Sequence, residues 1–119
     1  LAEQDSLKQR LRQYATEVTQ TTQRQWRIRP DFTMSITVPK NAVSTWVSLD
    51  ASSARAKRRA KVWLEYLLWL NFLNLDDQRS VKLERIAVLS DVTVVNSGLT
   101  TTQAKQYLQY RYDCSKREE

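Results

Sequence analysis

The chain has 119 residues, with 19 lysines and arginines against 13 aspartates and glutamates, and its formal net charge is +6. That length fits one domain. The chain has no histidine, one glycine and one cysteine, which excludes His-activated nucleophiles, glycine-rich phosphate loops, internal disulfides and multi-cysteine zinc sites. We therefore expect a non-enzymatic protein with no cofactor, no metal ion and no small-molecule ligand.

The ends of the chain and its longest apolar run bear on location. Because the chain begins with Leu1, we expect it to be processed or to be a piece of a longer protein. The longest apolar run, residues 62–73, is interrupted by Glu65 and Asn71, and it is shorter than the roughly 20 residues that span a bilayer. No apolar segment near the start resembles a signal peptide. A lone cysteine fits an oxidising or a reducing compartment.

Residues 3–23 carry a narrow apolar stripe that predicts a helix. Its members are spaced four, three and four residues apart: Leu7, Leu11, Tyr14 and Val18. This spacing is typical of a coiled-coil seam, so we expect residues 1–25 to form an N-terminal helix that pairs with another helix. The alternative is an ordinary amphipathic helix that lies on the protein's own core.

Residues 26–38 alternate strictly, which predicts a strand with one buried face. The even positions are apolar: Trp26, Ile28, Pro30, Phe32, Met34, Ile36 and Val38. Because proline cannot donate a ladder hydrogen bond, Pro30 predicts an edge, a bulge or a bend in the first half. The stronger strand is expected over residues 32–38.

Two helices are predicted between residues 41 and 75. Asn41 is a suitable N-cap for a short helix with Val43, Trp46 and Val47 on one face. A longer helix follows over residues 53–75, and its second half, residues 62–73, is apolar nearly all round, as expected at the centre of a core. Within that half Glu65 is the one acid, and Lys61 is its expected partner one turn earlier.

The remainder predicts a polar turn, strands and a charged tail. Residues 76–78 suggest a turn, and residues 81–95 suggest strand structure that is interrupted at residues 90–91. After a second turn at residues 96–98, the tyrosines of residues 106–114 favour a strand over a helix. We therefore expect an α+β fold over residues 26–114, with a small mixed sheet, helices on one face of it, and a charged tail at residues 115–119.

A basic cluster begins the long predicted helix. Its members are Arg55, Lys57, Arg58, Arg59 and Lys61, and all but Lys57 fall near one face of the helix. Cations at this end oppose the helix dipole, which favours a role in binding an acidic partner. A solvated surface is one alternative. Another is nucleic acid, held by this cluster as the second helix of a helix-turn-helix with residues 80–95 as a wing.

The order of these elements resembles a known family. The seamed helix over residues 7–18 precedes a strand at residues 32–38. A helix follows, then strand residues 81–95, and a Tyr-rich strand at residues 107–114 ends the outline. This outline resembles the periplasmic ferredoxin-like domains of inner-membrane alignment proteins in type IV pilus and type II secretion machines. The resemblance implies an assembly scaffold on the periplasmic side of a bacterial envelope.

These observations predict a non-enzymatic protein–protein interaction domain of a larger multi-subunit complex, such as a membrane-associated secretion, pilus or conjugation apparatus. We expect protein partners, including a second copy of the chain, with the cluster at residues 55–61 meeting an acidic partner. The alternative is a basic nucleic-acid-binding domain that uses the same helix start. The cytoplasm is the alternative location.

Overall fold

The computed structural model describes residue 9 and residues 18–118. The elements in chain order are β1 (Thr21–Arg29), β2 (Phe32–Pro39), β3 (Thr45–Leu49), α2 (Ala56–Leu73), α3 (Asp77–Ser80), β4 (Glu84–Val88), β5 (Thr93–Ser97) and α4 (Thr101–Glu118). Leu7, Leu11 and Tyr14 of the predicted seam lie outside the described residues. The predicted end of the first helix at residue 23 is wrong, because residues 21–23 belong to β1.

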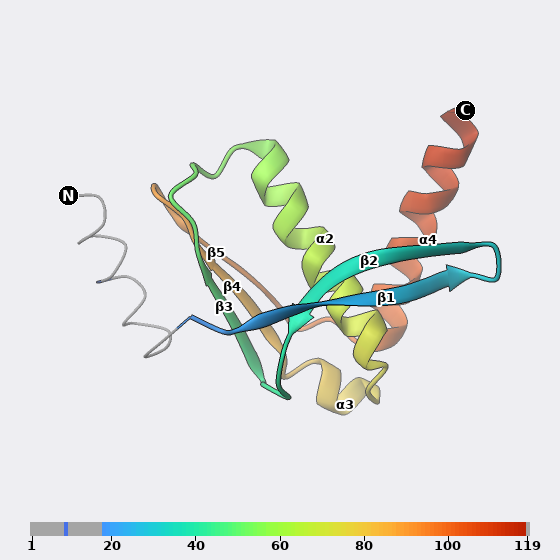
Figure 1. The fold of residues 1–119 in the computed structure, drawn as a ribbon, viewed down its shortest axis with the longest axis horizontal. Coiled ribbons are helices and arrows are strands. Elements are labelled where there is room, and N and C mark those ends of the chain that lie inside the picture. Colours follow the sequence, from blue (N-terminus) through green and yellow to red (C-terminus); the bar gives the residue numbers. More distant parts are fainter. Residues whose placement is uncertain (1–8, 10–17, 119) are drawn as a thin grey trace.

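Two small sheets confirm the α+β class. Strands β1 and β2 form an antiparallel pair, and the second sheet has the order β3-β4-β5, with β3 parallel to β4 and β4 antiparallel to β5. Helix α2 contacts β2, β4, β5 and α4, and in Figure 1 it lies between the three-stranded sheet and α4 with the hairpin crossing it. The ferredoxin-like arrangement is not confirmed, because β3 and β4, which α2 joins, are direct neighbours rather than a split β-α-β pair.

The alternating segment forms a hairpin rather than one strand. Pro30 and Asp31 make the turn, and the pairing of β1 with β2 shifts between Arg27 and Arg29. The expected bend at Pro30 is therefore a complete reversal of the chain. The strand predicted at residues 32–38 is confirmed as β2, and its buried face holds Ile36 and Val38 against α2.

Helix α2 is the centre of the core, as predicted, and it runs over residues 56–73 instead of 53–75. The rings of Trp69 and Trp46 meet edge to face, with centroids 5.5 Å apart. On another side of the helix, Trp63 meets Tyr107 of α4 at 5.7 Å. The helix ends at Asn74, which adopts a left-handed conformation (φ 49°) and donates its backbone N–H to the carbonyl of Leu70. Elements therefore surround the apolar helix on several sides.

The short helix predicted after Asn41 is wrong. Residues 45–49 form β3 instead, and Trp46 and Val47 are both 1% exposed. Successive side chains of a strand point to opposite faces, so Trp46 faces α2 while Val47 joins Ile86 and Val88 in a second cluster. The spacing that suggested a helix comes from a strand buried on both faces. Without a first helix, the alternative of a helix-turn-helix over residues 41–75 is also wrong.

The C-terminal strand predicted at residues 106–114 is wrong as well, because α4 covers residues 101–118. Ala104 is fully buried and Leu108 is packed against the same core, a four-residue spacing that suits a helix. Contacts with α2 thus outweigh the strand preference of tyrosine.

The turn predicted at residues 76–78 is a one-turn helix, α3, in which the Asp76 side chain accepts the Arg79 backbone N–H at 2.9 Å. The interruption at residues 90–91 is confirmed as the β4–β5 connection.

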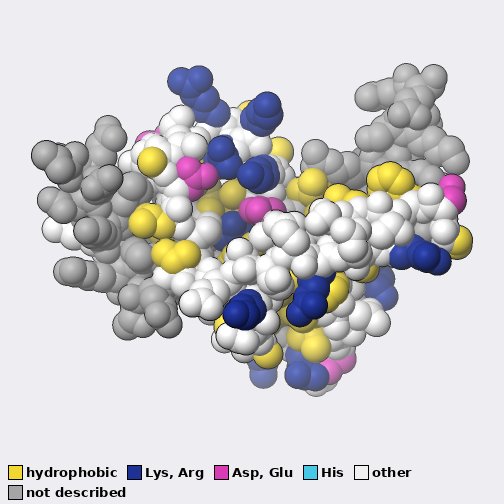
Figure 2. Space-filling view, in the orientation of Figure 1, with side chains coloured by type: hydrophobic (Ala, Val, Ile, Leu, Met, Phe, Trp, Pro, Cys, Tyr) yellow, Lys and Arg dark blue, Asp and Glu magenta, His cyan; other side chains and the backbone are white. Residues whose placement is uncertain are grey.

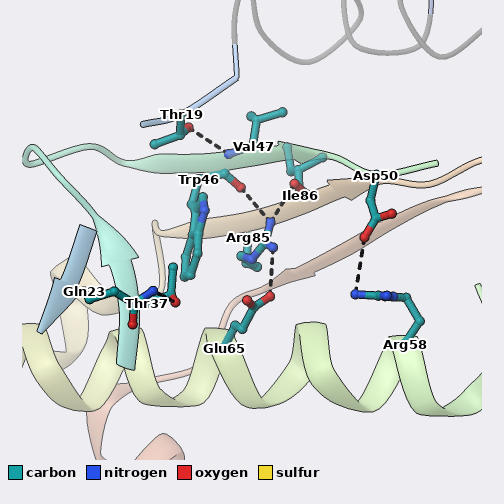
Figure 3. A network of polar contacts seen from close by, with 10 residues as sticks. All are labelled: Thr19, Gln23, Thr37, Trp46, Val47, Asp50, Arg58, Glu65, Arg85 and Ile86. Carbon is teal, nitrogen blue, oxygen red and sulfur yellow. Dashed lines mark hydrogen bonds and ion pairs between the residues drawn. The ribbon is translucent and has the colours of Figure 1, made fainter. Parts of the chain in front are cut away.

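Arg85 lies inside the protein with 3% exposure. Its Nη2 donates to Glu65 Oε1 of α2 at 3.0 Å, its Nη1 donates to the carbonyl of Ile86 at 2.9 Å, and its guanidinium lies 4.2 Å from the ring centroid of Trp46 (Figure 3). The prediction that Lys61 pairs with Glu65 is therefore wrong. Burial lowers the pKa of Arg85 and the charge of Glu65 opposes this shift, so the pair holds a cation in the core.

Candidate interaction surfaces

The five basic residues at the start of α2 form what we call the basic surface: Arg55, Lys57, Arg58, Arg59 and Lys61. Lys and Arg side chains gather over this end of α2, at the top of Figure 2. Arg55 is the N-cap residue, but its side chain makes no capping hydrogen bond, and the first turn of α2 contains no acid. Positive charge therefore accumulates where the helix dipole is itself positive.

Two members of the basic surface, Arg58 and Arg59, form an ion pair or hydrogen bonds with neighbouring residues of the protein. Arg58 Nη1 lies 3.3 Å from Asp50 Oδ2 (Figure 3), and Arg58 Nη2 donates to Ser52 Oγ at 3.3 Å. Arg59 Nε donates to the carbonyl of Ala54 at 3.0 Å. These contacts fix the loop that leads into α2, so both arginines have a structural role.

Asp50 and Asp91 hold the same loop through backbone hydrogen bonds that their carboxylates accept. Asp50 Oδ1 accepts the Ser52 backbone N–H at 2.8 Å, and Asp91 Oδ1 accepts the Ala54 backbone N–H at 2.9 Å. The pKa of Asp50 lies below its ordinary value because the Ser52 N–H stabilises the carboxylate, with a smaller contribution from Arg58. The pKa of Asp91 is lowered first by the Ala54 N–H.

The other three members, Arg55, Lys57 and Lys61, are exposed, and none pairs with another residue in the described part of the chain. Together with Arg58 they line an open hollow of about 800 Å³. Of the four candidates on the predicted face, the structure thus brings Arg55, Arg58 and Lys61 together. Arg59 lies outside the hollow, and Lys57, which was expected to the side, lines it.

A second surface, at the opposite end of α2, was not predicted. It is an open pocket of about 730 Å³ that is lined by residues from the end of the hairpin, the last turns of α2 and α3, and we call it the rimmed pocket. Its floor is apolar and consists of Val38, Val43, Trp69, Phe72, Leu73, Leu75 and Leu83. Below the hairpin in Figure 2, apolar side chains lie among Lys and Arg side chains.

The rim of this pocket is basic. Arg24, Lys40, Arg79 and Lys82 all line it and are all exposed, and no aspartate or glutamate lines it. Across residues 18–118 none of these four side chains has an ion pair or a hydrogen bond. The four positions are scattered along the sequence, so no local charge pattern could have revealed the rim.

Val18 is the one member of the predicted seam that the structure describes, and it is 41% exposed. The next residue, Thr19, joins the edge of β3, because its backbone N–H donates to the Val47 carbonyl at 2.9 Å and its hydroxyl accepts the Val47 N–H at 2.9 Å (Figure 3). The pairing of the seam with another helix stays a prediction.

Within the residues that the structure describes, no cluster of three or more acidic or cysteine side chains could hold a metal ion. No helix among those residues has the length and apolar character needed to cross a membrane. The chain matches no protein-family model, no curated protein and no solved structure. Functional proposals therefore rest on the two surfaces.

Proposed function

We propose that the protein is a non-enzymatic protein–protein interaction domain of a larger multi-subunit assembly, and that its basic surface contacts an acidic protein partner. The observation that carries the proposal is the unpaired state of the side chains of Arg55, Lys57 and Lys61, of which the first two lie at the N-cap and in the first turn of α2. Each cation in such a place costs roughly 0.3–1 kcal/mol. Acidic groups of a partner would remove this cost while filling the hollow.

Nucleic acid is the second candidate, since phosphates also match unpaired cations. Two features favour protein over nucleic acid. The helix pair that would have inserted into a DNA groove is replaced by β3 and α2. Of the aromatic residues that follow the basic surface, Tyr66 and Trp69 are 0% and 2% exposed and offer no face for base stacking. The partly buried Trp63 already packs its ring against Tyr66 and Tyr107.

The proposed assembly is a membrane-associated secretion, pilus or conjugation complex, the setting that the resemblance in the sequence implies. The last element of that outline, at residues 107–114, is part of α4 and not a strand, so this part of the proposal rests on the earlier elements alone. In that setting the domain acts as a scaffold, and its first helix joins a second copy or another subunit. The periplasmic side of the envelope is the proposed location.

The test is sedimentation velocity of the purified chain at two concentrations, alone, with poly-L-glutamate and with a mixed-sequence DNA duplex, at low and physiological salt. We expect poly-L-glutamate to co-sediment. The double variant Arg55→Glu with Lys61→Glu should abolish this binding. The matched control, Arg27→Glu with Lys105→Glu, changes the net charge equally at exposed positions elsewhere and should retain it.

Three results bear on the proposal. Binding of poly-L-glutamate that the first variant loses and the control keeps would support it. Binding of DNA alone, falling steeply as salt rises, would replace it with the nucleic-acid function. A monomer at both concentrations that binds neither polyanion would overturn both functions.

A further inference from the structure

We propose that the rimmed pocket is the docking site for an acidic segment of a protein partner, which inserts a bulky apolar side chain between its acidic residues. The site lies at the C-terminal end of α2, whereas the basic surface lies at the N-terminal end. This inference goes beyond the proposed function, because it stands even where the basic surface binds nucleic acid.

The floor of the pocket argues for an apolar anchor. Phe72, Leu73 and Leu75 are partly exposed there, while Trp69 and Leu83 are buried behind them. The volume of about 730 Å³ lies within the range of known ligand sites, roughly 300–1,000 Å³. An apolar side chain that enters the pocket removes these surfaces from water, which is the main favourable contribution to most protein association.

The rim argues for several negative charges. Arg24 comes from β1, Lys40 follows β2, and Arg79 and Lys82 come from α3 and the turn after it. A ligand with one carboxylate, such as a fatty acid, neutralises one of these four cations. A peptide segment with several acids matches them around the opening, and this complementarity also speeds and orients association.

The floor also argues against a nucleic acid as the occupant. Phosphates would reach the rim, but they would leave the apolar floor in contact with water. The largest aromatic ring of the floor, Trp69, is 2% exposed, which leaves Phe72 as the one partly exposed ring of the floor on which a base could stack. Charge and apolar area together therefore favour an acidic peptide.

The experiment is a titration of the full chain, followed by NMR of its backbone amides and tryptophan indoles. The probe is a synthetic peptide in which glutamates alternate with leucine and phenylalanine, added up to its solubility limit. We expect shifts at Val43, Phe72 and Lys82, which line the pocket. A peptide with lysines in place of the glutamates is the ligand control.

Two double variants separate the rimmed pocket from the basic surface. Arg79→Glu with Lys82→Glu should weaken peptide binding at least about tenfold, which corresponds to about 1.4 kcal/mol. Both side chains are exposed, so this variant should fold, as an unchanged amide spectrum would show. The matched variant Lys57→Glu with Lys61→Glu makes the same charge change at the other end of α2 and should keep the peptide-induced shifts at the rimmed pocket, whatever it does to binding at the basic surface.

The possible outcomes divide clearly. Shifts at the pocket that the rim variant alone removes would support the proposal. Shifts that palmitate or a DNA duplex produces there, but that the peptide does not, would overturn it in favour of those ligands. Loss of binding only in the Lys57 and Lys61 variant would move the acidic partner to the basic surface, which contradicts this inference and leaves the proposed function intact. No pocket shift with any probe would also overturn it.

Discussion

Replacing Glu65 with alanine should destabilise the protein strongly, because the change leaves the guanidinium of Arg85 buried without its counter-ion. Arg85 is 3% exposed, and its contact with Glu65 Oε1 is 3.0 Å long. Removing one partner of a buried ion pair costs about 3–5 kcal/mol. The Glu65 side chain is 22% exposed, so water reaches the vacated site, and the ring of Trp46 still faces the cation. We therefore expect a loss of about 3 kcal/mol, at the low end of that range.

The pair as a whole should contribute much less than the loss of one partner. Desolvation of two charges offsets most of their attraction, and Arg85 Nε has no hydrogen-bond acceptor in the described part of the chain. The free energy of unfolding of the double variant Glu65→Leu with Arg85→Met should therefore lie within about 1 kcal/mol of that of the natural protein. Glu65→Gln keeps the shape of the side chain and a hydrogen-bond acceptor but not the charge. Its free energy of unfolding should lie between that of Glu65→Ala and that of the double variant.

Urea unfolding, followed by far-ultraviolet circular dichroism, measures all of these free energies. The single variants Glu65→Leu and Arg85→Met, measured beside their double variant, complete a double-mutant cycle. We expect a large coupling energy between Glu65 and Arg85. A loss below about 1 kcal/mol in Glu65→Ala, or single effects that add within about 0.5 kcal/mol, would refute it. Glu84→Ala, a change at a half-buried acid with no ion pair among the described residues, is the control.

Three further predictions concern single residues. The pKa of Asp50 is held below its ordinary 3.8, mainly by the Ser52 N–H. The ionised Asp50 carboxylate therefore stabilises the folded protein fully above pH 3.8, and this stabilisation is lost as the pH falls through the pKa of the folded state. Asp50→Asn should remove the Asp50 contribution to the loss of stability in acid, as measured by urea unfolding at a series of pH values. Tyr66→Phe should cost about 1–2 kcal/mol in the same assay, because the fully buried Tyr66 hydroxyl accepts the Leu99 N–H at 3.1 Å. Asn74→Val should lower thermal stability by about 1–2 kcal/mol and Asn74→Gly should not, because φ is 49° there; equal effects would contradict this.

Sequence periodicity predicted the type of two elements correctly: β2, a strand with one buried face, and α2, a helix that is buried on nearly every side. The alternation over residues 32–38 corresponds to β2, and the apolar segment over residues 62–73 lies in α2. It failed for β3, because a strand buried on both faces does not alternate and the adjacent Trp46 and Val47 mimicked a helix. It failed for α4, where contacts of Ala104 with the core outweighed the intrinsic preference of the tyrosines.

The candidate sites divide in the same way. The basic surface was predictable because its members are adjacent in sequence, although the structure was needed to show that Arg58 and Arg59 are bound to the chain itself. The rimmed pocket was not, because tertiary structure alone brings its four cations together. Likewise the helical four-residue rule assigned Lys61 to Glu65, whereas the partner in the fold lies 20 residues away on β4.

The buried position of Arg85 also restricts how β3 and β4 can align. In the native pairing Trp46 lies beside Arg85, and Val47 lies beside Ile86. A slip of β4 by one residue would turn every side chain of that strand to the other face, which would place the cation on the face that holds Val47 and out of reach of Glu65. Sheets buried on both faces have little apolar contrast to prevent such a slip. One charged residue thus makes the misaligned sheet costly, and α2 can close only over the native alignment.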